Sequence, residues 1–233
     1  MFDVETLIER YAVPDRARPH LRVSFVSSLD GAAWLDGRSG PLNDEWDQQV
    51  FATLRRLSDA VLVGAGTVRI EGYDGLTLDE ESQRWRVEHG LPPHARLAIV
   101  SHALDLDPTA AVFTEAPVRP LVVTHATAPA ARREALAQVA DVLVHGERSV
   151  DLPAAVADLA ARGMPQVLCE GGPTLLGALV AADAVDELDL TISPVLVSGT
   201  AARIAHGPQR LVPMRMVHAL PGGPMLFLRY VRA

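Results

Sequence analysis

The chain alternates short runs rich in Val, Leu and Ile with segments whose apolar residues recur at helical spacing. Nearly continuous apolar runs of this kind are typical of strands that are buried on both faces, as in a parallel sheet. Strand–helix alternation predicts a three-layer α/β domain with a mostly parallel central sheet. The predicted strands cover residues 21–28, 59–64, 96–101, 120–125, 141–146 and 165–170, and the predicted helices cover residues 44–58, 128–139 and 151–163.

The last two apolar runs, at 186–197 and 224–233, are not separated by a convincing helical pattern. We expect these two strands to pair antiparallel at one side of the sheet. The pieces at 72–95, 102–119 and 198–224 contain Pro and Gly and are interpreted as loops. Because the pattern shows no linker and no repeat, residues 1–233 are predicted to form a single domain, with residues 1–19 as an N-terminal extension.

Arginine supplies all 21 basic residues, because the sequence contains no lysine. The absence of lysine excludes a Walker P-loop and a Schiff-base mechanism. A net charge of −8 without a basic block argues against nucleic-acid binding. The longest apolar run is shorter than the roughly 20 residues that a membrane span needs, and the first residues do not resemble a secretory signal. Since the single Cys169 cannot form an internal disulfide, we expect a cytoplasmic protein. Its eight histidines are scattered, so no metal site is expected.

Small and polar residues follow three of the predicted strands, in SSLDG (27–31), GAGTVR (64–69) and EGGPT (170–174). Ligands of open α/β sheets bind beyond the carboxyl ends of the strands, so these segments mark a candidate site. A helix N-terminus favours an anion such as a pyrophosphate, and glycine permits its close approach. Neither glycine-containing segment matches the Rossmann fingerprint, and glycines at strand–helix turns also occur for steric reasons alone.

A set of longer motifs gives a resemblance to a known family. SSLDG, SGPL, LRRLSDAVLVGAGTVR, EGYDG and EGGPTLLGALVAADAVDELDLTISPVLVSG resemble, in combination and in order, the reductase domain of the riboflavin-biosynthesis pyrimidine reductase family. The resemblance extends from about residue 20 to the end and is strongest to the stand-alone, actinobacterial-type branch. It implies a dihydrofolate-reductase-like fold, an NADPH-dependent reductase activity and a homodimer. The chain has no PCxxC motif, and its single cysteine cannot build a deaminase zinc site.

The resemblance also implies roles for individual residues. The family's usual substrate is a ribosylaminopyrimidine phosphate, whose ribose, opened to an imine, is reduced to ribityl by hydride from NADPH. Ser39, Arg55 and Glu170 would face this substrate. The residues expected to bind NADPH are Gly66, Thr67, Glu71, Ser101, Gly171, Gly172, Pro173, Thr174 and Leu175, and the segment from Gly172 to Ala178 would hold the phosphates.

Asp47 is the sharpest catalytic candidate. It shares one face of the predicted helix with Val50 and Leu54, which would point its carboxylate inward. Such a group can pair with an amidine-like pterin or pyrimidine edge and help to protonate the reduced centre. The alternative is that Asp47 only complements the positive helix end, as Asp44 and Glu45 would. Because many riboflavin-pathway reductases lack an acid at this position, Asp47 favours a pterin-like ring.

Glu170 is the second catalytic candidate, since a lone carboxylate at the end of a buried strand needs a partner. We expect it to bind a substrate hydroxyl or the amide of the dihydronicotinamide. Arg55 is predicted to bind the anionic tail of the substrate with a bidentate fork, or else to be a solvated helix residue. Arg69 and Arg203 are the alternatives for the 2′-phosphate of NADPH.

Two further residues are interpreted as structural. Asp30 precedes a glycine in a turn and can bond its own backbone, and Cys169 is expected to be a small buried hydrophobe. The sequence therefore predicts an NADPH-dependent reductase with two competing substrates, a ribosylaminouracil phosphate and dihydrofolate. The alternative function that involves no catalysis is that of an NADPH-binding protein.

Overall fold

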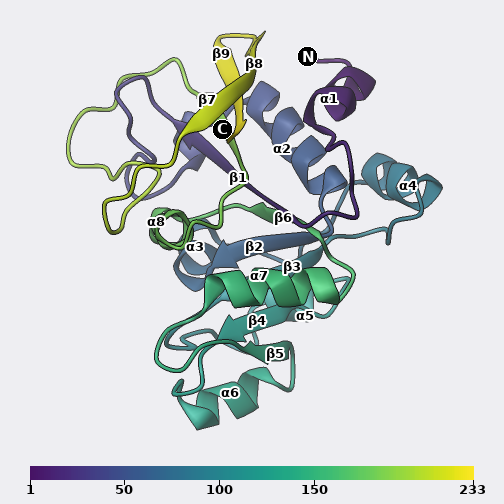
Figure 1. Ribbon diagram of the computed structural model, residues 1–233, viewed down its shortest axis with the longest axis vertical. Coiled ribbons are helices and arrows are strands. Elements are labelled where there is room, and N and C mark those ends of the chain that lie inside the picture. Colours follow the sequence, from purple (N-terminus) through teal and green to yellow (C-terminus); the bar gives the residue numbers. More distant parts are fainter.

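The computed structural model describes residues 1–233, and its centre is a nine-stranded sheet with helices on both faces (Figure 1). The strands are β1 (His20–Ser27), β2 (Ala60–Gly64), β3 (Arg96–Val100), β4 (Leu121–Thr124), β5 (Asp141–Val144), β6 (Gln166–Cys169), β7 (Glu187–Ile192), β8 (Met214–Gly222) and β9 (Met225–Arg232). Their order in the sheet is β5-β4-β3-β2-β6-β1-β7-β9-β8. Every pairing from β5 to β7 is parallel, whereas β9 pairs antiparallel with both β7 and β8. The predicted sheet, mostly parallel with an antiparallel C-terminal part, is confirmed.

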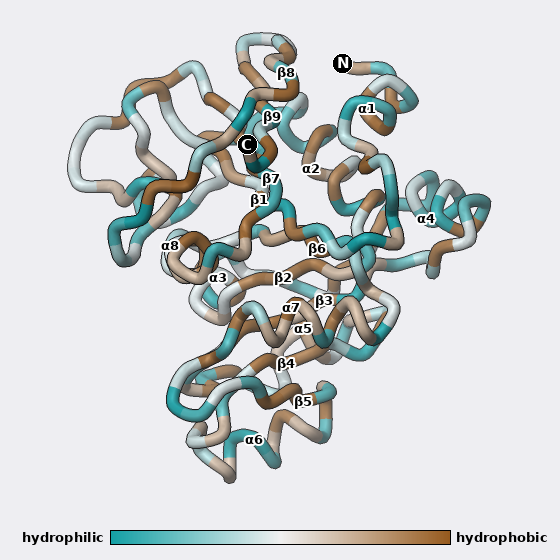
Figure 2. Tube along the Cα trace, in the orientation of Figure 1, coloured by the Kyte–Doolittle hydropathy of each residue, from teal (hydrophilic) through white to brown (hydrophobic).

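Two hydrophobic cores separate the sheet from its helical layers. One core holds apolar side chains of five helices and of alternate strand residues such as Val61 and Val63. The other holds Leu62 with side chains of two helices, so the three-layer architecture is also confirmed. The first layer contains α1 (Val4–Tyr11), α2 (Glu45–Leu57), α3 (Ala65–Glu71), α5 (Ala111–Thr114) and α6 (Ala130–Leu136), and the second contains α7 (Leu152–Ala161) and α8 (Pro173–Ala181). Figure 2 shows the apolar character of β2 and β4. None of the helices has the length and apolar content that a membrane crossing requires.

The helix α7 shows how local signals set the boundaries of an element. The carboxylate of Asp151 accepts a hydrogen bond from the N–H of Ala154, and Pro153 lies in the first turn. Proline is tolerated there because its missing N–H would have no partner within the helix. Gly163 follows the end of the helix with a φ of +82°, a conformation that favours glycine. The helix predicted at residues 151–163 is therefore confirmed, and it begins at Leu152 and ends at Ala161.

The three segments interpreted as loops contain regular structure, so that interpretation was wrong in part. The helix α4 (Glu80–Glu88) has few apolar residues, and its buried Arg86 donates hydrogen bonds to the carbonyls of Arg56, Ser58 and Pro92. Its place is thus fixed by tertiary hydrogen bonds, which leave no apolar periodicity to detect. The short α5 lies in the second segment, and β8 lies in the third. As an edge strand, β8 tolerates Pro221, which made the segment look like a loop.

The N-terminal extension contains α1, which packs on α2. Arg22 donates to the carbonyl of Tyr11 at 2.7 Å, and Arg229 donates to the carbonyl of Arg10, so two strands hold the end of the helix. Both arginines also pair with the buried Glu187. Burial alone would raise the pKa of Glu187, but the neighbouring cations, Arg22 first, lower it to about 2. The N-terminal residues are therefore an integral part of the fold.

Candidate active site

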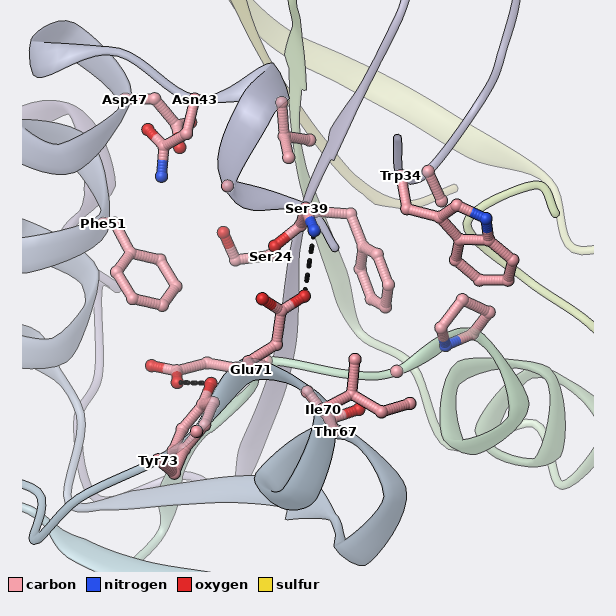
Figure 3. A pocket seen from close by; sticks show the side chains of 18 of the residues that line it. Ser24, Trp34, Ser39, Asn43, Asp47, Phe51, Thr67, Ile70, Glu71 and Tyr73 are labelled. Atoms are coloured by element: carbon pink, nitrogen blue, oxygen red, sulfur yellow. Dashed lines mark hydrogen bonds between the residues drawn. The ribbon is translucent and has the colours of Figure 1, made fainter. Parts of the chain in front are cut away.

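A cavity of about 490 Å³ opens where β1, β2 and β6 end, in the range of small-ligand sites (Figure 3). Its walls come from β1, from the loop at residues 33–43, from α2, from α3 with the turn that follows it, and from the β6–α8 turn. The structure thus brings together segments from five places in the sequence. Of the residues predicted for the site, the cavity is lined by Ser39, Asp47, Arg55, Thr67, Glu71, Glu170, Gly172 and Pro173.

Arg55 and Glu170 form a bidentate ion pair in the wall of this cavity. The Nε and Nη2 groups of Arg55 donate to the two carboxylate oxygens of Glu170 at 2.6 and 2.7 Å. The hydroxyl of Tyr73 donates a third hydrogen bond to Glu170 at 2.7 Å. The guanidinium also lies 4.4 Å from the ring centre of Phe51, which is a cation–π distance. The side chain of Glu170 is only 1% exposed, so the three hydrogen bonds compensate a buried charge.

The pKa values of this group follow from its geometry. Burial alone would lower the pKa of Arg55, but the adjacent carboxylate of Glu170 raises it above its ordinary value. Burial, and then the same carboxylate, raises the pKa of Tyr73 well above its ordinary range. Both groups therefore remain protonated, as hydrogen-bond donors to Glu170, over the whole physiological pH range.

This pair changes two of the sequence predictions. Arg55 was expected to bind the anionic tail of a substrate, but its fork is occupied by a carboxylate of the chain itself. Glu170 was expected to need a partner, which it finds in Arg55 and Tyr73. Tyr73 was missed as a site residue, although it lies in the EGYDG motif that contributed to the resemblance.

Asp47 lies in the first turn of α2, and its side chain lines the cavity beside Asn43 (Figure 3). Asp44 caps the helix, because its carboxylate accepts hydrogen bonds from the N–H groups of Trp46 and Asp47. Because Asp44 already caps the helix, Asp47 is not needed to stabilise the helix end. Burial raises the pKa of Asp47 to about 6, although the hydroxyl of Thr191 acts in the opposite direction. A carboxyl group that titrates near neutral pH is suited to acid–base work.

The glycine pair of EGGPT is required first by packing within the chain. A Cβ atom on Gly172 would lie 2.7 Å from the hydroxyl oxygen of Thr67, and one on Gly171 would lie 2.7 Å from the ring of Phe25. The N–H of Gly64 also donates to the carbonyl of Gly171 at 2.7 Å. The β6–α8 turn and the β2–α3 turn are thus in direct contact. Their glycines let the two turns meet, so the close approach needs no ligand to explain it.

The residues around these turns fit a nicotinamide dinucleotide. Pro173 begins α8, and no side chain caps this helix, so the first N–H groups have no partner within it. Such a helix end favours a phosphate group, and Thr67 adds a hydroxyl at the edge of the cavity. Thr174 is exposed at the same end of the helix. A pyrophosphate at this position would lie next to the cavity that contains Asp47 and Glu170.

Several predicted cofactor residues do not line the cavity. Ser101 is buried at the end of β3, and Leu175 is buried in the core behind α8, so only its backbone remains available. Gly66 lies in the first turn of α3, where a Cβ atom would meet open space. Glu71 does line the cavity, and its carboxylate accepts a hydrogen bond from the N–H of Ser39 at 2.9 Å.

The remaining candidates have clear surroundings. Arg69 donates to the carbonyl of Asp105 at 2.6 Å, and Arg203 is exposed in a loop. Asp30 accepts a hydrogen bond from the hydroxyl of Ser28 in its own turn and from the N–H groups of Val197 and Ser198, so its structural role also includes joining two loops. The hydroxyl of Ser28, and then these two N–H groups, lowers the pKa of Asp30 to about 2.

Cys169 and the histidines complete the inventory of reactive groups. Cys169 is fully buried, and burial raises the pKa of its thiol to about 12, so its interpretation as a small hydrophobe is confirmed. No group of three or more His, Cys, Asp and Glu side chains is arranged to hold a metal ion.

Comparison with known proteins gives consistent matches. The family described as RibD C-terminal domain matches residues 19–228. The 2,5-diamino-6-ribosylamino-4(3H)-pyrimidinone 5′-phosphate reductase of Archaeoglobus fulgidus is 30% identical over 183 residues, which are 78% of this chain and 83% of that protein. The riboflavin biosynthesis protein RibD of Mycobacterium tuberculosis is 27% identical over 80% of this chain but only 45% of its own, longer sequence.

Solved structures show the same fold. A pyrimidine reductase-like protein from Corynebacterium diphtheriae superposes with a TM-score of 0.89 and 25% identity, covering 100% of this chain and 99% of the other. A dihydrofolate reductase from Enterococcus faecalis, complexed with NADP(H), superposes with a TM-score of 0.52 and 14% identity over 91% of this chain and 96% of the other. The second likeness is one of fold, and it confirms the dihydrofolate-reductase-like architecture.

Proposed function

The chain belongs to the RibD C-terminal domain family, and on that premise we propose that it is an NADPH-dependent reductase of a ribosylaminopyrimidine 5′-phosphate in riboflavin biosynthesis. The observation that supports this proposal is one cavity with two different sides. One side is the helix end and hydroxyl that fit a dinucleotide, and the other carries Asp47 and the fixed carboxylate of Glu170. Relatives that share most of this chain's length are named as reductases of such a substrate.

In the proposed reaction, the cofactor supplies the hydride and the protein binds and orients the substrate. Reduction of the opened ribose adds a hydride to the imine carbon and a proton, drawn from solvent, to the nitrogen. Bound NADPH supplies the hydride. Glu170 is held in place by three hydrogen bonds, so it can accept hydrogen bonds from ribose hydroxyls without first reorienting. Asp47, at another part of the cavity, is assigned to the heterocycle.

The direct test follows NADPH oxidation at 340 nm with purified protein. We expect absorbance to fall only when a ribosylaminopyrimidine phosphate is added, and more slowly with NADH. The variant Glu170→Gln should lose about 10- to 100-fold in kcat/KM, because an oriented anionic acceptor is replaced by a neutral amide. Glu134→Gln, which changes an exposed carboxylate, is the matched control. Binding of NADPH without substrate-dependent oxidation would instead support the non-catalytic alternative.

Dihydrofolate is a second candidate substrate, and Asp47 is the observation that favours it. A buried carboxyl group with a pKa of about 6 on this helix can pair with the amidine edge of a pterin and protonate the ring. The same assay with dihydrofolate in place of the ribosylaminopyrimidine measures this activity. No oxidation of NADPH with dihydrofolate at millimolar concentration would remove the candidate.

We also propose that two copies of the chain associate through the edge strand β8. An edge strand presents unpaired backbone groups, and exposed apolar side chains on β8 and β9 include Met216, Val217 and Leu226. Light scattering should give the mass of a dimer. Val217→Lys should shift the protein toward the monomer, and an unchanged monomeric mass for the wild type would refute the proposal.

A further inference from the structure

A pair of histidines lies at the carboxyl ends of β3 and β4, outside the lining of the cavity described above. The imidazole rings of His102 and His125 stack with their centres 4.1 Å apart. Two residues before them, Val100 and Val123 pair with each other, and Val100 also pairs with Gly64 at the end of β2. Because the N–H of Gly64 bonds the β6–α8 turn, the histidines continue the row of strand ends that begins at the turns that fit the dinucleotide.

His125 is the fixed member of this pair. It is only 4% exposed, its Nε2 lies 3.1 Å from the carbonyl oxygen of His102, and its Nδ1 lies 3.1 Å from the hydroxyl oxygen of Thr127. That hydroxyl in turn donates to the carbonyl of Glu147 at 2.9 Å. His102 is exposed, and neither nitrogen of its ring has a partner within the chain. The ring of His102 is therefore oriented by stacking before a ligand binds, and its N–H remains available as a donor.

Two arginines of α6 add positive charge next to the pair. Arg132 donates to the carbonyl of Ala103 at 3.0 Å, and Arg133 donates to the carbonyl of Ala126 at 3.4 Å. These carbonyls belong to the residues that directly follow the two histidines. Neither arginine takes part in an ion pair. The two histidines and two arginines thus form a basic surface that is suited to an anion.

A dinucleotide in the proposed site extends toward this surface. Its pyrophosphate would lie at the start of α8, over the ends of β2 and β6, and its nicotinamide would enter the cavity on the side of β1. The adenosine half then continues in the opposite direction, over β3 and β4, which follow β2 in the sheet (Figure 1). Adjacent strands lie about 4.8 Å apart, so the ends of β3 and β4 are about 5 and 10 Å from the end of β2. An adenosine group spans this interval.

We infer that His102, held by His125 and flanked by Arg132 and Arg133, binds the 2′-phosphate of NADPH and sets the preference of this chain for NADPH over NADH. The inference rests on the proposed function and names the residues that select its cofactor. A phosphate group accepts hydrogen bonds from imidazole and guanidinium N–H groups, and such charge-assisted bonds are stronger than neutral ones. NADH has a hydroxyl group in place of the 2′-phosphate and gains no such bond.

The two arginines that the sequence suggested for this phosphate are less well placed. Arg69 already donates to the carbonyl of Asp105 and lies 3.9 Å from the carboxylate of the same residue. Arg203 follows Ala202, whose carbonyl accepts a hydrogen bond from the N–H of Ala33 in the cavity wall. Arg203 therefore lies on the nicotinamide side of the cofactor, away from the ends of β3 and β4.

The test compares NADP⁺ and NAD⁺ by titration calorimetry, which measures binding without hydride transfer. We expect the wild-type protein to bind NADP⁺ at least about 100-fold more tightly than NAD⁺. His102→Phe keeps an aromatic ring stacked on His125 but removes both ring nitrogens. This variant should bind NADP⁺ about 10- to 100-fold more weakly, and its affinity for NAD⁺ should be unchanged, which also shows that it is folded.

A second stacked histidine provides the matched control. His89 at the end of α4 is also exposed, and its ring stacks on that of Trp85 with the centres 4.0 Å apart. His89→Phe should leave the affinities for both nucleotides unchanged. Phosphorus NMR adds a readout that is independent of affinity. The resonance of the 2′-phosphate of bound NADP⁺ should differ between the wild type and His102→Phe, whereas the two pyrophosphate resonances should not.

Each outcome of these measurements bears on a different claim. A preference for NADP⁺ that survives in His102→Phe overturns the inference, and so does a preference that is lost in Arg69→Gln or Arg203→Gln instead. Equal binding of NADP⁺ and NAD⁺ by the wild type also overturns it, but that result leaves a reductase that uses either nucleotide. Binding of neither nucleotide would refute the proposed function, and the inference with it.

Discussion

Replacing Arg55 by methionine should destabilise the protein strongly, because the substitution leaves the carboxylate of Glu170 buried with one donor instead of three. That side chain is 1% exposed, and only the hydroxyl of Tyr73 would remain bonded to it. Removing one partner of a buried ion pair raises the free energy of the folded state by about 3–5 kcal/mol. Since Arg55 is itself 23% exposed beside a cavity, we expect a somewhat smaller cost, about 2–4 kcal/mol.

A double-mutant cycle distinguishes the pair from the separate side chains. Glu170→Gln alone keeps an acceptor for Tyr73 and leaves a partly exposed arginine, so it should cost about 1–3 kcal/mol. In the double variant both charges are absent, and the loss of stability should be smaller than the sum of the two single losses by about 1.5 kcal/mol or more. Urea unfolding followed by circular dichroism gives the four free energies of unfolding, those of the wild type, the two single variants and the double variant, provided that the transitions are two-state.

An exposed pair serves as the internal standard for this cycle. Arg84 and Glu80 lie one turn apart on α4, with their charged atoms 4.0 Å apart and their side chains 67% and 90% exposed. The same cycle at this pair should give a coupling of about 0.3–0.5 kcal/mol. If the losses at Arg55 and Glu170 add up to within about 0.5 kcal/mol, the two residues do not act as a unit, and the reasoning about the site would be refuted.

Three further predictions concern stability. Asp47→Asn should stabilise the protein by about 2–3 kcal/mol at pH 8 and by almost nothing at pH 4. The reason is that a carboxyl group whose pKa is raised in the folded protein lowers the stability of the fold as pH rises from about 4 to 6. Urea unfolding at both pH values measures this difference. Gly172→Ala should destabilise the wild-type protein by about 1–3 kcal/mol, and clearly less when Thr67→Ala removes the clashing hydroxyl. Gly66→Ala should not destabilise the protein, because its new Cβ atom meets open space. Thermal unfolding compares the variants. Asp30→Ala should speed amide hydrogen exchange in the loop that Asp30 holds at neutral pH, and this protection should fade in the wild type only as pH falls through about 2.

The central strands and the main helices were predictable because each is defined by its own sequence. A parallel strand covered on both faces, such as β2 or β4, consists of apolar residues throughout, so a short window identifies it. The helix α4 and the strand β8 do not meet this condition. The position of α4 depends on Arg86 reaching carbonyls on α2 and after it, and β8 depends on pairing with β9 alone. Contacts with distant segments leave no periodic signal in the sequence.

The site was predictable only to the level of single residues. Helical spacing placed Asp47 on the inward face of α2, and the end of a buried strand placed Glu170 at the rim of the sheet, and both line the cavity. The pairing of Glu170 with Arg55 spans 115 positions along the chain. It exists because α2 packs against the end of β6, a relation that no local pattern contains. Tyr73 joins them from a third segment, so the group as a whole could be found only in the fold.

At position 55, the presence of arginine rather than lysine has a physical reason. A lysine at position 55 would offer a point charge on a flexible stem, and it could satisfy the two oxygens of Glu170 only in turn. The guanidinium of Arg55 binds both oxygens at once and is held by the ring of Phe51. The orientation of Glu170 is therefore set before a substrate arrives, and substrate binding need not supply the free energy of ordering it. Asp47 differs from Glu170, because it is a buried carboxylate of this cavity that forms no ion pair.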